Sequence, residues 1–257
     1  MARELSGTGQ YYSGTQSFFT GTLPVTMACW YRVDSVSSSM GLMCLRSAAN
    51  GALRLAYRGD LVNDPIYAVV RTTGGMFADA SVDSGVAANT WAHAAAVFAS
   101  TTSRTAYTNG TAGTTNTTSR DAGTSINTVD VGNFGGGTLL DGQVAEAAIW
   151  TVALTTAEIA LLADGLSPLF VRPQSLAFYA PLFGRAGAGG EEEDWVGGAP
   201  LTATGSPTVA EHPRIIYPRR RSMIFVPGAG GGAPTLSDLQ AASITATTVQ
   251  GTYDYAF

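Results

Sequence analysis

The chain has 257 residues, 13% of them charged, and its formal net charge is −5. All fourteen lysine-plus-arginine positions are arginine, whereas an average soluble domain is about 25% charged and uses both residues. Because Schiff-base chemistry and P-loop phosphate binding both use a lysine amine, the composition excludes them. The net negative charge and the scattered arginines also argue against a nucleic-acid partner.

The sequence has no pattern typical of membrane insertion or export. No apolar run reaches the roughly 18 residues of a spanning helix. Residues 1–7 lack the apolar stretch of a signal peptide. We therefore expect a protein that is made and matures in the cytoplasm and has no membrane partner.

Strand patterns separated by glycine, asparagine and serine turns fill the chain up to residue 150. Residues 27–33 are almost continuously apolar, which indicates a strand that is buried on both faces. Residues 53–58 alternate, so Arg54 and Arg58 are expected to face outward and the leucines and tyrosine inward. Asn109-Gly110 favours the type I′ turn of a hairpin. Further strands are predicted at 66–71, 91–98, before residue 109 and at 144–150.

The two cysteines lie in apolar, strand-like segments. Cys29 follows Met27-Ala28, and Cys44 follows Leu42-Met43. A free thiol in such a segment behaves as a small hydrophobic side chain. In a cytoplasmic product we expect two buried thiols rather than a disulfide.

One helix is predicted near residues 155–164. Thr155 and Glu158 form a capping box, in which each side chain can bond to the backbone N–H of the other residue. Ile159 and Leu162 then lie on one helical face, and Gly165 followed by a proline favours the end of the helix. Such a helix would cover an edge or an end of the strand layers.

The C-terminal region divides at a glycine-rich linker that begins at residue 228. We therefore predict one domain over 1–227 and an appended segment over 228–257. Aromatic residues alternate at its end, which indicates a strand that adds to a sheet edge of a neighbouring subunit or another protein. Folding back onto its own domain is the alternative. The residues expected to make these assembly contacts are Tyr253, Tyr255, Phe257, Arg219, Arg220 and Arg221.

Three segments carry a family resemblance: Trp91–Gly110, Asp141–Trp150 and Ala153–Ile159. Their order and spacing resemble the laminin-G-like members of the concanavalin A-like lectin/glucanase superfamily, over roughly residues 1–183. The resemblance implies an all-β, antiparallel jelly-roll sandwich with one short helix and a C-terminal strand extension. Residues 176–213 also resemble phage and prophage proteins, and we interpret 176–182 as a closing strand of the same sandwich.

The residues that could carry catalysis do not form a catalytic pattern. Glucanases of this superfamily place paired glutamates on one strand face in a Glu-x-Asp-x-x-Glu pattern, which the chain lacks. Glu191–Asp194 follow one another in a glycine-flanked loop, and we interpret them as a solvated acidic loop. His93 shares its strand face with Ala95 and Val97, which favours a core or edge histidine. We expect no enzymatic activity.

Calcium is the metal that the resemblance implies, held by loop carboxylates and carbonyls. Asp60, Asn63 and Asp64 form the candidate oxygen cluster. The alternative, which we favour, is that these side chains form turns by bonding to their own backbone. We expect no cofactor. Tyr57 and Tyr67 could stack on a sugar, but each lies in an alternating strand where core packing is the default.

Two function classes follow from the resemblance. The leading hypothesis is a non-enzymatic bacteriophage virion structural protein, of the capsid-decoration or accessory head or tail type. It would be located in the virion and would bind copies of itself and other virion proteins. The alternative is a carbohydrate-binding module that recognises a host or environmental glycan.

Overall fold

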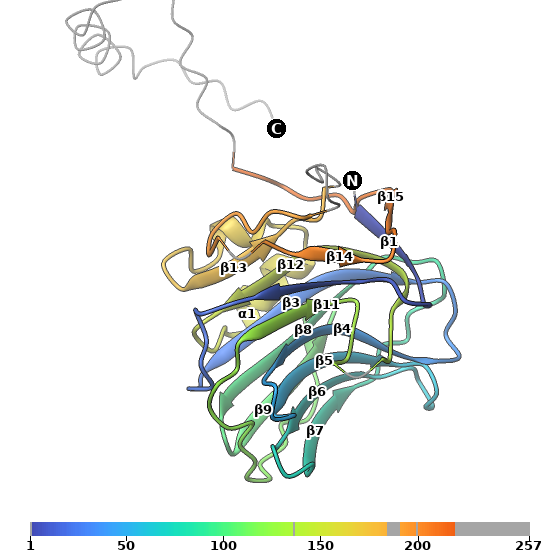
Figure 1. Cartoon of the computed structure of the whole chain (residues 1–257). Helices are drawn as coiled ribbons and strands as arrows, with labels where there is room; N and C mark the ends of the chain where they lie inside the picture. The colour runs from blue at the N-terminus through green and yellow to red at the C-terminus, as the bar shows by residue number, and fades with distance from the viewer. Residues whose placement is uncertain (1, 136, 184–190, 199, 219–257) are drawn as a thin grey trace, which may run out of the picture. The chain divides into compact units, whose positions relative to one another are not determined.

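The computed structural model describes residues 2–135, 137–183, 191–198 and 200–218 (Figure 1). These residues form strands with a single α-helix, α1 (Thr156–Ala163), and a short 3-10 helix, η1 (Pro168–Phe170). The strands are β1 (Ala2–Ser6), β2 (Tyr11–Thr15), β3 (Val25–Val33), β4 (Ser39–Arg46), β5 (Ala52–Arg58), β6 (Ile66–Arg71), β7 (Phe77–Val82), β8 (Ala92–Ser100), β9 (Ser103–Thr108), β10 (Thr111–Ala112), β11 (Thr128–Val131), β12 (Asp141–Trp150), β13 (Leu176–Ala180), β14 (Thr202–Thr204) and β15 (Thr208–Ala210).

The strands form two antiparallel sheets. Sheet A has the order β10-β9-β8-β3-β12-β1-β15, and β13 pairs with the second half of β12. Sheet B has the order β14-β2-β11-β4-β5-β6-β7. Strands β4 to β7 follow one another along the chain, whereas pairs such as β3–β12 and β2–β11 join strands that are distant in sequence, as in a jelly roll, and the sheets lie face to face as a sandwich (Figure 1). The predicted all-β jelly-roll fold is confirmed.

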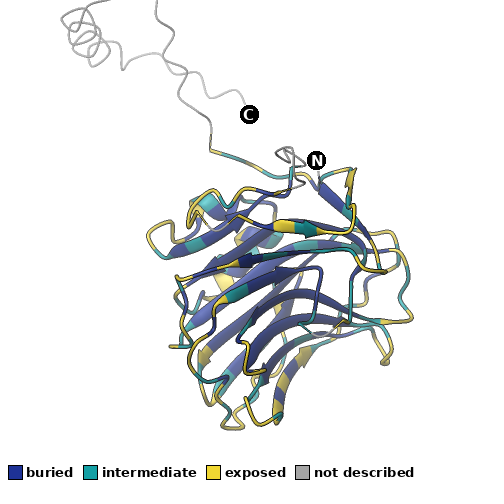
Figure 2. Cartoon of the chain, in the orientation of Figure 1, coloured by how far each residue is buried: buried dark blue, intermediate teal, exposed yellow. Residues whose placement is uncertain are grey.

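The core lies between the two sheets, where the strands are buried along most of their length (Figure 2). The alternation predicted for β5 is confirmed, because Leu53, Leu55 and Tyr57 all lie in this core. Most of β3 is buried as predicted, although Trp30 is only half-buried. Burial of one large apolar side chain, such as leucine, contributes about 1.5–3 kcal/mol to the stability of the fold. The two sheets are therefore held together mainly by this core.

The predicted local signals are confirmed at the helix and at the hairpin. The Thr155 hydroxyl accepts from the Glu158 N–H while the Glu158 carboxylate accepts from the Thr155 N–H. Asn109 and Gly110 both have positive φ, 44° and 80°, in the turn between β9 and β10. Ile159 of the helix is fully buried against sheet A, in a second apolar layer.

The C-terminal part of the described chain completes both sheets. β13 pairs with β12, as predicted for a closing strand. β14 then pairs with β2 at one edge of sheet B, and β15 pairs with β1 at one edge of sheet A. The compact unit ends at Pro218. The predicted linker and strand extension over 228–257 lie outside the described residues.

Both cysteines are buried free thiols, as predicted. Cys29 lies on β3 of sheet A and Cys44 on β4 of sheet B. Burial raises the pKa of Cys44 to about 12. A thiol with a raised pKa holds little reactive thiolate at neutral pH, so these cysteines serve packing. Neither described helical segment is long and apolar enough to cross a bilayer.

Candidate functional site

The outer faces of the two sheets differ. The outer face of sheet A is covered by an apolar layer that includes Ile159 and Leu162 of α1. Both described helical segments pack on that sheet, α1 on β8 and η1 on β13. Neither of these two helical segments packs on the outer face of sheet B, which we call the open face. By alternation with core neighbours, the side chains on this face include Tyr11, Ser13, Thr15, Cys44, Arg46, Arg54, Arg58, Tyr67, Val69, Arg71, Phe77, Asp79, Ser81, Thr128, Asp130, Thr202 and Thr204.

One loop lies against part of the open face. A side chain at Gly41 would place its Cβ only 2.1 Å from the backbone nitrogen of Phe134. Gly41 on β4 therefore allows the backbone of the β11–β12 loop to lie directly on the sheet. The loop brings the Phe134 ring over Arg54, whose guanidinium carbon is 4.3 Å from the ring centroid.

A hollow of about 460 Å³ lies at the β14 end of the open face. Its volume is within the range of small-ligand sites. Four hydroxyl side chains and one guanidinium line it, so its walls are predominantly hydrogen-bonding groups. The lining residues are Ser13, Gly14, Thr15, Arg46, Thr128, Pro200 and Thr202.

The buried carboxylate of Asp130 holds the Arg46 guanidinium, which is the charged group that lines the hollow. The Asp130 side chain is fully buried and accepts from the Ser13 hydroxyl at 2.6 Å. It also accepts from Arg46 Nε at 2.6 Å and from Arg46 Nη2 at 3.4 Å. This hydrogen bonding raises the pKa of Arg46. Charge-assisted bonds of this kind hold the guanidinium in one orientation.

Arginines stack on aromatic rings across the rest of the open face. The guanidinium carbon of Arg58 is 5.4 Å from the Tyr67 ring centroid, and that of Arg71 is 5.7 Å from the Phe77 ring centroid. The Phe77 side chain remains half exposed. Flat apolar surfaces beside fixed polar groups are what a sugar ring requires, since its faces stack and its rim forms hydrogen bonds.

The family model for the concanavalin A-like lectin/glucanase superfamily matches residues 6–160. This chain belongs to that superfamily. No curated protein sequence matches this concanavalin A-like chain. The matched stretch holds β2 to β12, and it therefore includes all open-face strands except β14.

Two solved structures share the fold of this concanavalin A-like domain at low sequence identity. A Bacteroides ovatus protein to which carbohydrate binding is ascribed superposes with a TM-score of 0.60 and 20% identity over 84% of this chain. The match covers 61% of that protein's length. Domain 4 of AbnA, an extracellular GH43 arabinanase of Geobacillus stearothermophilus solved with arabinotriose, superposes with a TM-score of 0.51 and 18% identity, over 63% of this chain and 76% of that one. At these identities the likeness shows a lectin-like fold.

The candidate calcium residues of the concanavalin A-like domain form turns. Both carboxylate oxygens of Asp60 accept from Arg58, each at 2.8 Å, and this lowers the pKa of Asp60. Asn63 donates to Asp83, and Asn63 and Asp64 have positive φ of 66° and 49°. The described ranges contain no group of three or more His, Cys, Asp or Glu side chains arranged to hold a metal.

The acidic loop is only partly solvated, and the interpretation of it as a solvated loop is wrong for Glu192. That side chain is 3% exposed, and its Oε1 lies 2.5 Å from Nε of Arg3, itself 6% exposed. Glu191 and Glu193 are exposed as predicted. Asp194 accepts from the backbone N–H of Tyr179, which ties the loop to β13. Within this run of four acidic residues, Glu191 and Glu193 therefore face solvent, whereas Glu192 and Asp194 contact the rest of the domain.

A second polar group is buried on the far side of the concanavalin A-like domain. Glu146 adopts a positive φ of 57° at a bulge in β12 and is 3% exposed. Its carboxylate accepts from the hydroxyls of Tyr179 at 2.7 Å and Tyr217 at 2.5 Å. Nε2 of His212 lies 3.2 Å from Glu146 Oε1. Sequence spacing could not reveal this group, because Tyr217 joins it from 71 residues away.

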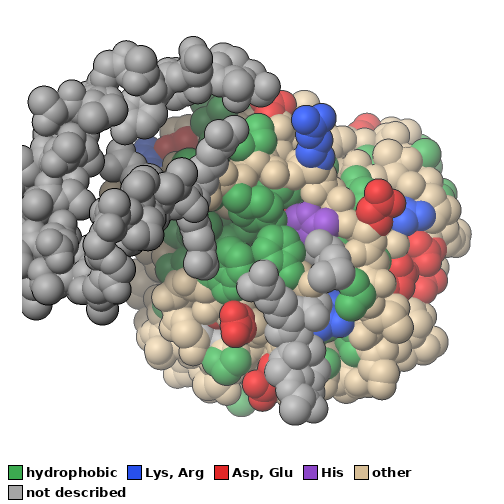
Figure 3. Space-filling view, turned by 90° about the horizontal axis from the view of Figure 1, so that it is seen from above, with side chains coloured by type: hydrophobic (Ala, Val, Ile, Leu, Met, Phe, Trp, Pro, Cys, Tyr) green, Lys and Arg blue, Asp and Glu red, His purple; other side chains and the backbone are tan. Residues whose placement is uncertain are grey.

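Aromatic rings surround this group at the surface. The Phe183 ring centroid lies 5.4 Å from that of Trp195, 5.2 Å from that of His212 and 5.5 Å from that of Tyr217. Figure 3 shows hydrophobic side chains gathered around a histidine on this side of the molecule. The rings shield the Glu146 carboxylate from water, which suits a structural ion network rather than a catalytic acid.

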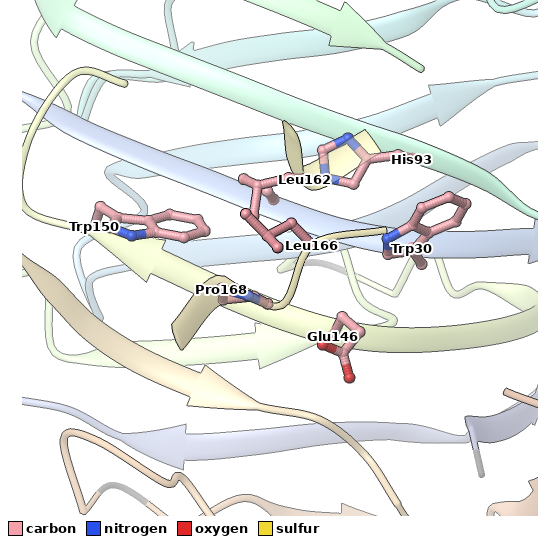
Figure 4. A pocket seen from close by; sticks show the side chains of 8 residues that line it. Trp30, His93, Glu146, Trp150, Leu162, Leu166 and Pro168 are labelled. Atoms are coloured by element: carbon pink, nitrogen blue, oxygen red, sulfur yellow. The ribbon is translucent and has the colours of Figure 1, made fainter. Parts of the chain in front are cut away.

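A cavity of about 10 Å³ separates Glu146 from His93 and Trp30 (Figure 4). This volume suits about one water molecule and excludes a sugar. His93 is 2% exposed, and its Nδ1 has no hydrogen-bond partner among the described residues. The predicted core position of His93 is confirmed, and its ring packs edge-on against Trp30.

We expect His93 to make the domain acid-sensitive. Burial lowers the pKa of His93 from 6.5 to about 3, so the folded protein keeps this ring neutral while the unfolded chain takes up a proton. The stabilising contribution is complete above pH 6.5 and is lost as the pH falls towards 3, by about 1.4 kcal/mol per pH unit. Urea unfolding between pH 7 and pH 4 measures this slope. A His93→Gln variant should show a shallower slope by about one proton, and equal slopes would contradict the assignment.

The predicted assembly residues cannot be placed in this site. Tyr253, Tyr255, Phe257 and Arg219–Arg221 lie outside the described residues. Their contribution to assembly stays a prediction. Sequence reasoning missed the open face as a unit, because its members come from seven strands that are adjacent only after folding.

Proposed function

We propose that this protein is a non-enzymatic glycan-binding domain whose ligand occupies the open face over the hydroxyl-lined hollow. The observation that carries the proposal is the hollow itself, in which four hydroxyls surround a guanidinium that Asp130 holds in place. The carbohydrate binding ascribed to the Bacteroides ovatus protein and the arabinotriose bound to the arabinanase domain support this assignment.

The hollow offers the donors and acceptors that sugar hydroxyls need. Thr15 and Thr202 can each donate one hydrogen bond and accept others, and Thr128, whose hydroxyl donates to Asn127 Oδ1 at 3.2 Å, can still accept. Arg46 uses two of its three nitrogens for Asp130, which leaves Nη1 for a ligand, and its side chain is 33% exposed. Because the Arg46–Asp130 pair is already ordered, little side-chain entropy is lost on binding.

The carboxylates of the open-face strands are too far apart for glycoside hydrolysis. Asp79 and Asp130 are the acidic residues of the seven strands in sheet B. Asp79 is on β7 and Asp130 on β11, four strand spacings apart, which is about 19 Å along the sheet. Glycosidases place their two carboxyl groups about 5–9.5 Å apart. This separation supports a binding role.

The test is a glycan-binding screen followed by calorimetric titration of the oligosaccharide that binds best. Thr128→Val keeps the shape of the hollow and removes a hydroxyl, so we expect affinity to fall about 3- to 10-fold, as for the loss of one hydrogen bond. Arg46→Gln should cost about 10-fold or more, because bonds to a charged group are stronger. Thr111→Val, on exposed β10 of sheet A, is the matched control.

Two results would contradict the proposal. The first is the absence of glycan binding across neutral and acidic oligosaccharides by a folded protein. The second is unchanged affinity in both hollow variants, which would place the ligand elsewhere. If the protein released reducing sugar from the bound glycan, it would be an enzyme. Only the non-enzymatic part of the proposal would then be wrong, and glycan binding would stand.

A virion structural role is the second candidate. The segment that resembles phage proteins, 176–213, includes β13, β14 and β15, so it is an integral part of the sandwich rather than an attachment. A lectin-like domain on a virion would bind copies of itself and other virion proteins, and glycan binding is compatible with that role. Regular, abundant copies on a purified particle would support the virion role, and absence from particles would contradict it.

A further inference from the structure

Three arginines form a triangle on neighbouring strands of the open face. Arg46 and Arg71 both lie opposite Ala52, one on each side of β5. Arg54 lies two residues along β5 from Ala52, and its side chain therefore points to the same face. Diagonal neighbours across adjacent strands are about 7–8 Å apart, which describes Arg54 with each of the other two, whereas Arg46 and Arg71 are two strand spacings apart, about 9.5 Å. We call these residues the arginine triangle.

The triangle is short of negative charge. Within the described part of the chain, Arg46 is the one member that forms an ion pair with a carboxylate, that of Asp130. Arg54 is 6% exposed, makes no ion pair with any described residue, and its buried Nε has no hydrogen-bond partner. Arg71 donates to the carbonyl oxygen of Asn50 and stacks near Phe77. A buried cation without a counter-ion is costly, and a bound anion would offset that cost.

The charge of the open face is opposite to that of the domain. The strands of sheet B carry four arginines and two aspartates, a net charge of +2. The described residues as a whole carry ten arginines and seventeen carboxylates, a net charge of −7. The positive charge is thus concentrated on β4, β5 and β6, with Arg46 at the rim of the hollow, and it would steer anions to this face.

We propose that the open face selects glycans that carry an anionic group, a uronate carboxylate or a sulfate ester, and that the two partly exposed members of the arginine triangle, Arg46 and Arg71, bind that group while the covered Arg54 adds its positive charge beneath Phe134. This inference rests on the proposed glycan-binding function and names its ligand class. Arginine presents paired N–H donors that match a carboxylate or a sulfate in one plane. A nucleic acid fits less well, because its closely spaced phosphates need many cations and the domain around the triangle is acidic.

The test compares matched oligosaccharides that differ only in charge. Probes are uronate oligosaccharides with their methyl esters, and sulfated oligosaccharides with their desulfated forms, titrated against the full chain. We expect the charged member of at least one pair to bind about 10-fold or more tightly than its neutral partner. Raising the salt concentration from 0.05 to about 0.5 M should reduce this preference, because ions screen the attraction.

Arg71→Gln is the informative variant, since Arg71 is partly exposed and its loss leaves the Arg46–Asp130 pair intact. It should abolish most of the preference for the charged probe, measured as the ratio of the affinities for the charged and the neutral member of a pair. Arg214→Gln removes an exposed arginine from the segment that packs on sheet A, and it should leave both affinities unchanged.

The outcomes separate this inference from the proposed function. Equal binding of charged and neutral probes, or an Arg71→Gln variant that keeps the preference, would overturn the inference and leave glycan binding intact. Failure of every probe to bind would overturn both. Displacement of the charged probe by single-stranded DNA at equal charge concentration would also overturn it, because the face would then recognise charge without the sugar.

Discussion

Replacement of Glu192 by alanine is expected to lower the free energy of unfolding by about 3–5 kcal/mol. Arg3 and Glu192 are 6% and 3% exposed, and the atoms that join them are 2.5 Å apart. Removal of one partner leaves the other charge buried without compensation, which is far more costly than the net value of the pair. Urea unfolding followed by tryptophan fluorescence measures the loss.

Glu193→Ala is the matched control, because Glu193 is the exposed neighbour of Glu192 and should change stability by less than about 0.5 kcal/mol. A second variant separates charge burial from simple loss of packing. If Arg3→Met is combined with Glu192→Leu, both charges are removed together, and most of the stability should return. A Glu192→Ala variant as stable as Glu193→Ala would show that the pair does not hold the domain together.

The same residues show where sequence reasoning succeeds and where it stops. Strands such as β3, β5, β6, β8 and β12, the Asn109-Gly110 hairpin and the capping box at Thr155 were predictable, because each depends on residues within a few positions of one another. Glu192 was not, since a run of four acids looks solvated until Arg3 is brought to it from 189 residues away. Burial of one acid in a charge run requires a tertiary partner, and no local pattern reports it.

The same distinction applies to the candidate site, where features set by local sequence were predictable and features set by tertiary contacts were not. Alternation along β5 predicted that Arg54 points outward, but not that Phe134 covers it. That cover depends on Gly41, a glycine in a different strand, where any Cβ would collide with the loop. The hollow likewise needs β14, a strand of three residues that carries too little pattern to be recognised alone. Sites assembled from strand faces become visible only once strand order is known.

A chain truncated after Phe183 is expected to lose cooperative folding, whereas a chain truncated after Pro218 should unfold at the same urea midpoint as the full chain. The family resemblance extends to residue 183, but the compact unit continues to Pro218. The segment between these points supplies β14 and β15, one at an edge of each sheet. Its removal would expose the hydrogen-bonding edges of β2 and β1 to water or to other chains.

Three losses add up within the shorter chain. Arg3 would lose Glu192, at about 3–5 kcal/mol. The core would lose Leu201, which is completely buried, at about 2–5 kcal/mol. The Glu146 carboxylate would keep the Tyr179 hydroxyl but lose that of Tyr217, which leaves a buried charge less satisfied. Together these losses reach the 5–15 kcal/mol that stabilises a typical domain.

The two truncated chains can be compared by size-exclusion chromatography and urea unfolding. The chain that ends at Pro218 should elute as a folded species with a single sigmoidal transition. The chain that ends at Phe183 should aggregate or unfold gradually, because strand pairing at both sheet edges is lost. If the shorter chain instead showed a cooperative transition within about 1 kcal/mol of the longer one, residues 191–218 would be an attachment to the sandwich. The buried contacts of Glu192, Leu201 and Tyr217 would then contribute far less stability than their burial implies.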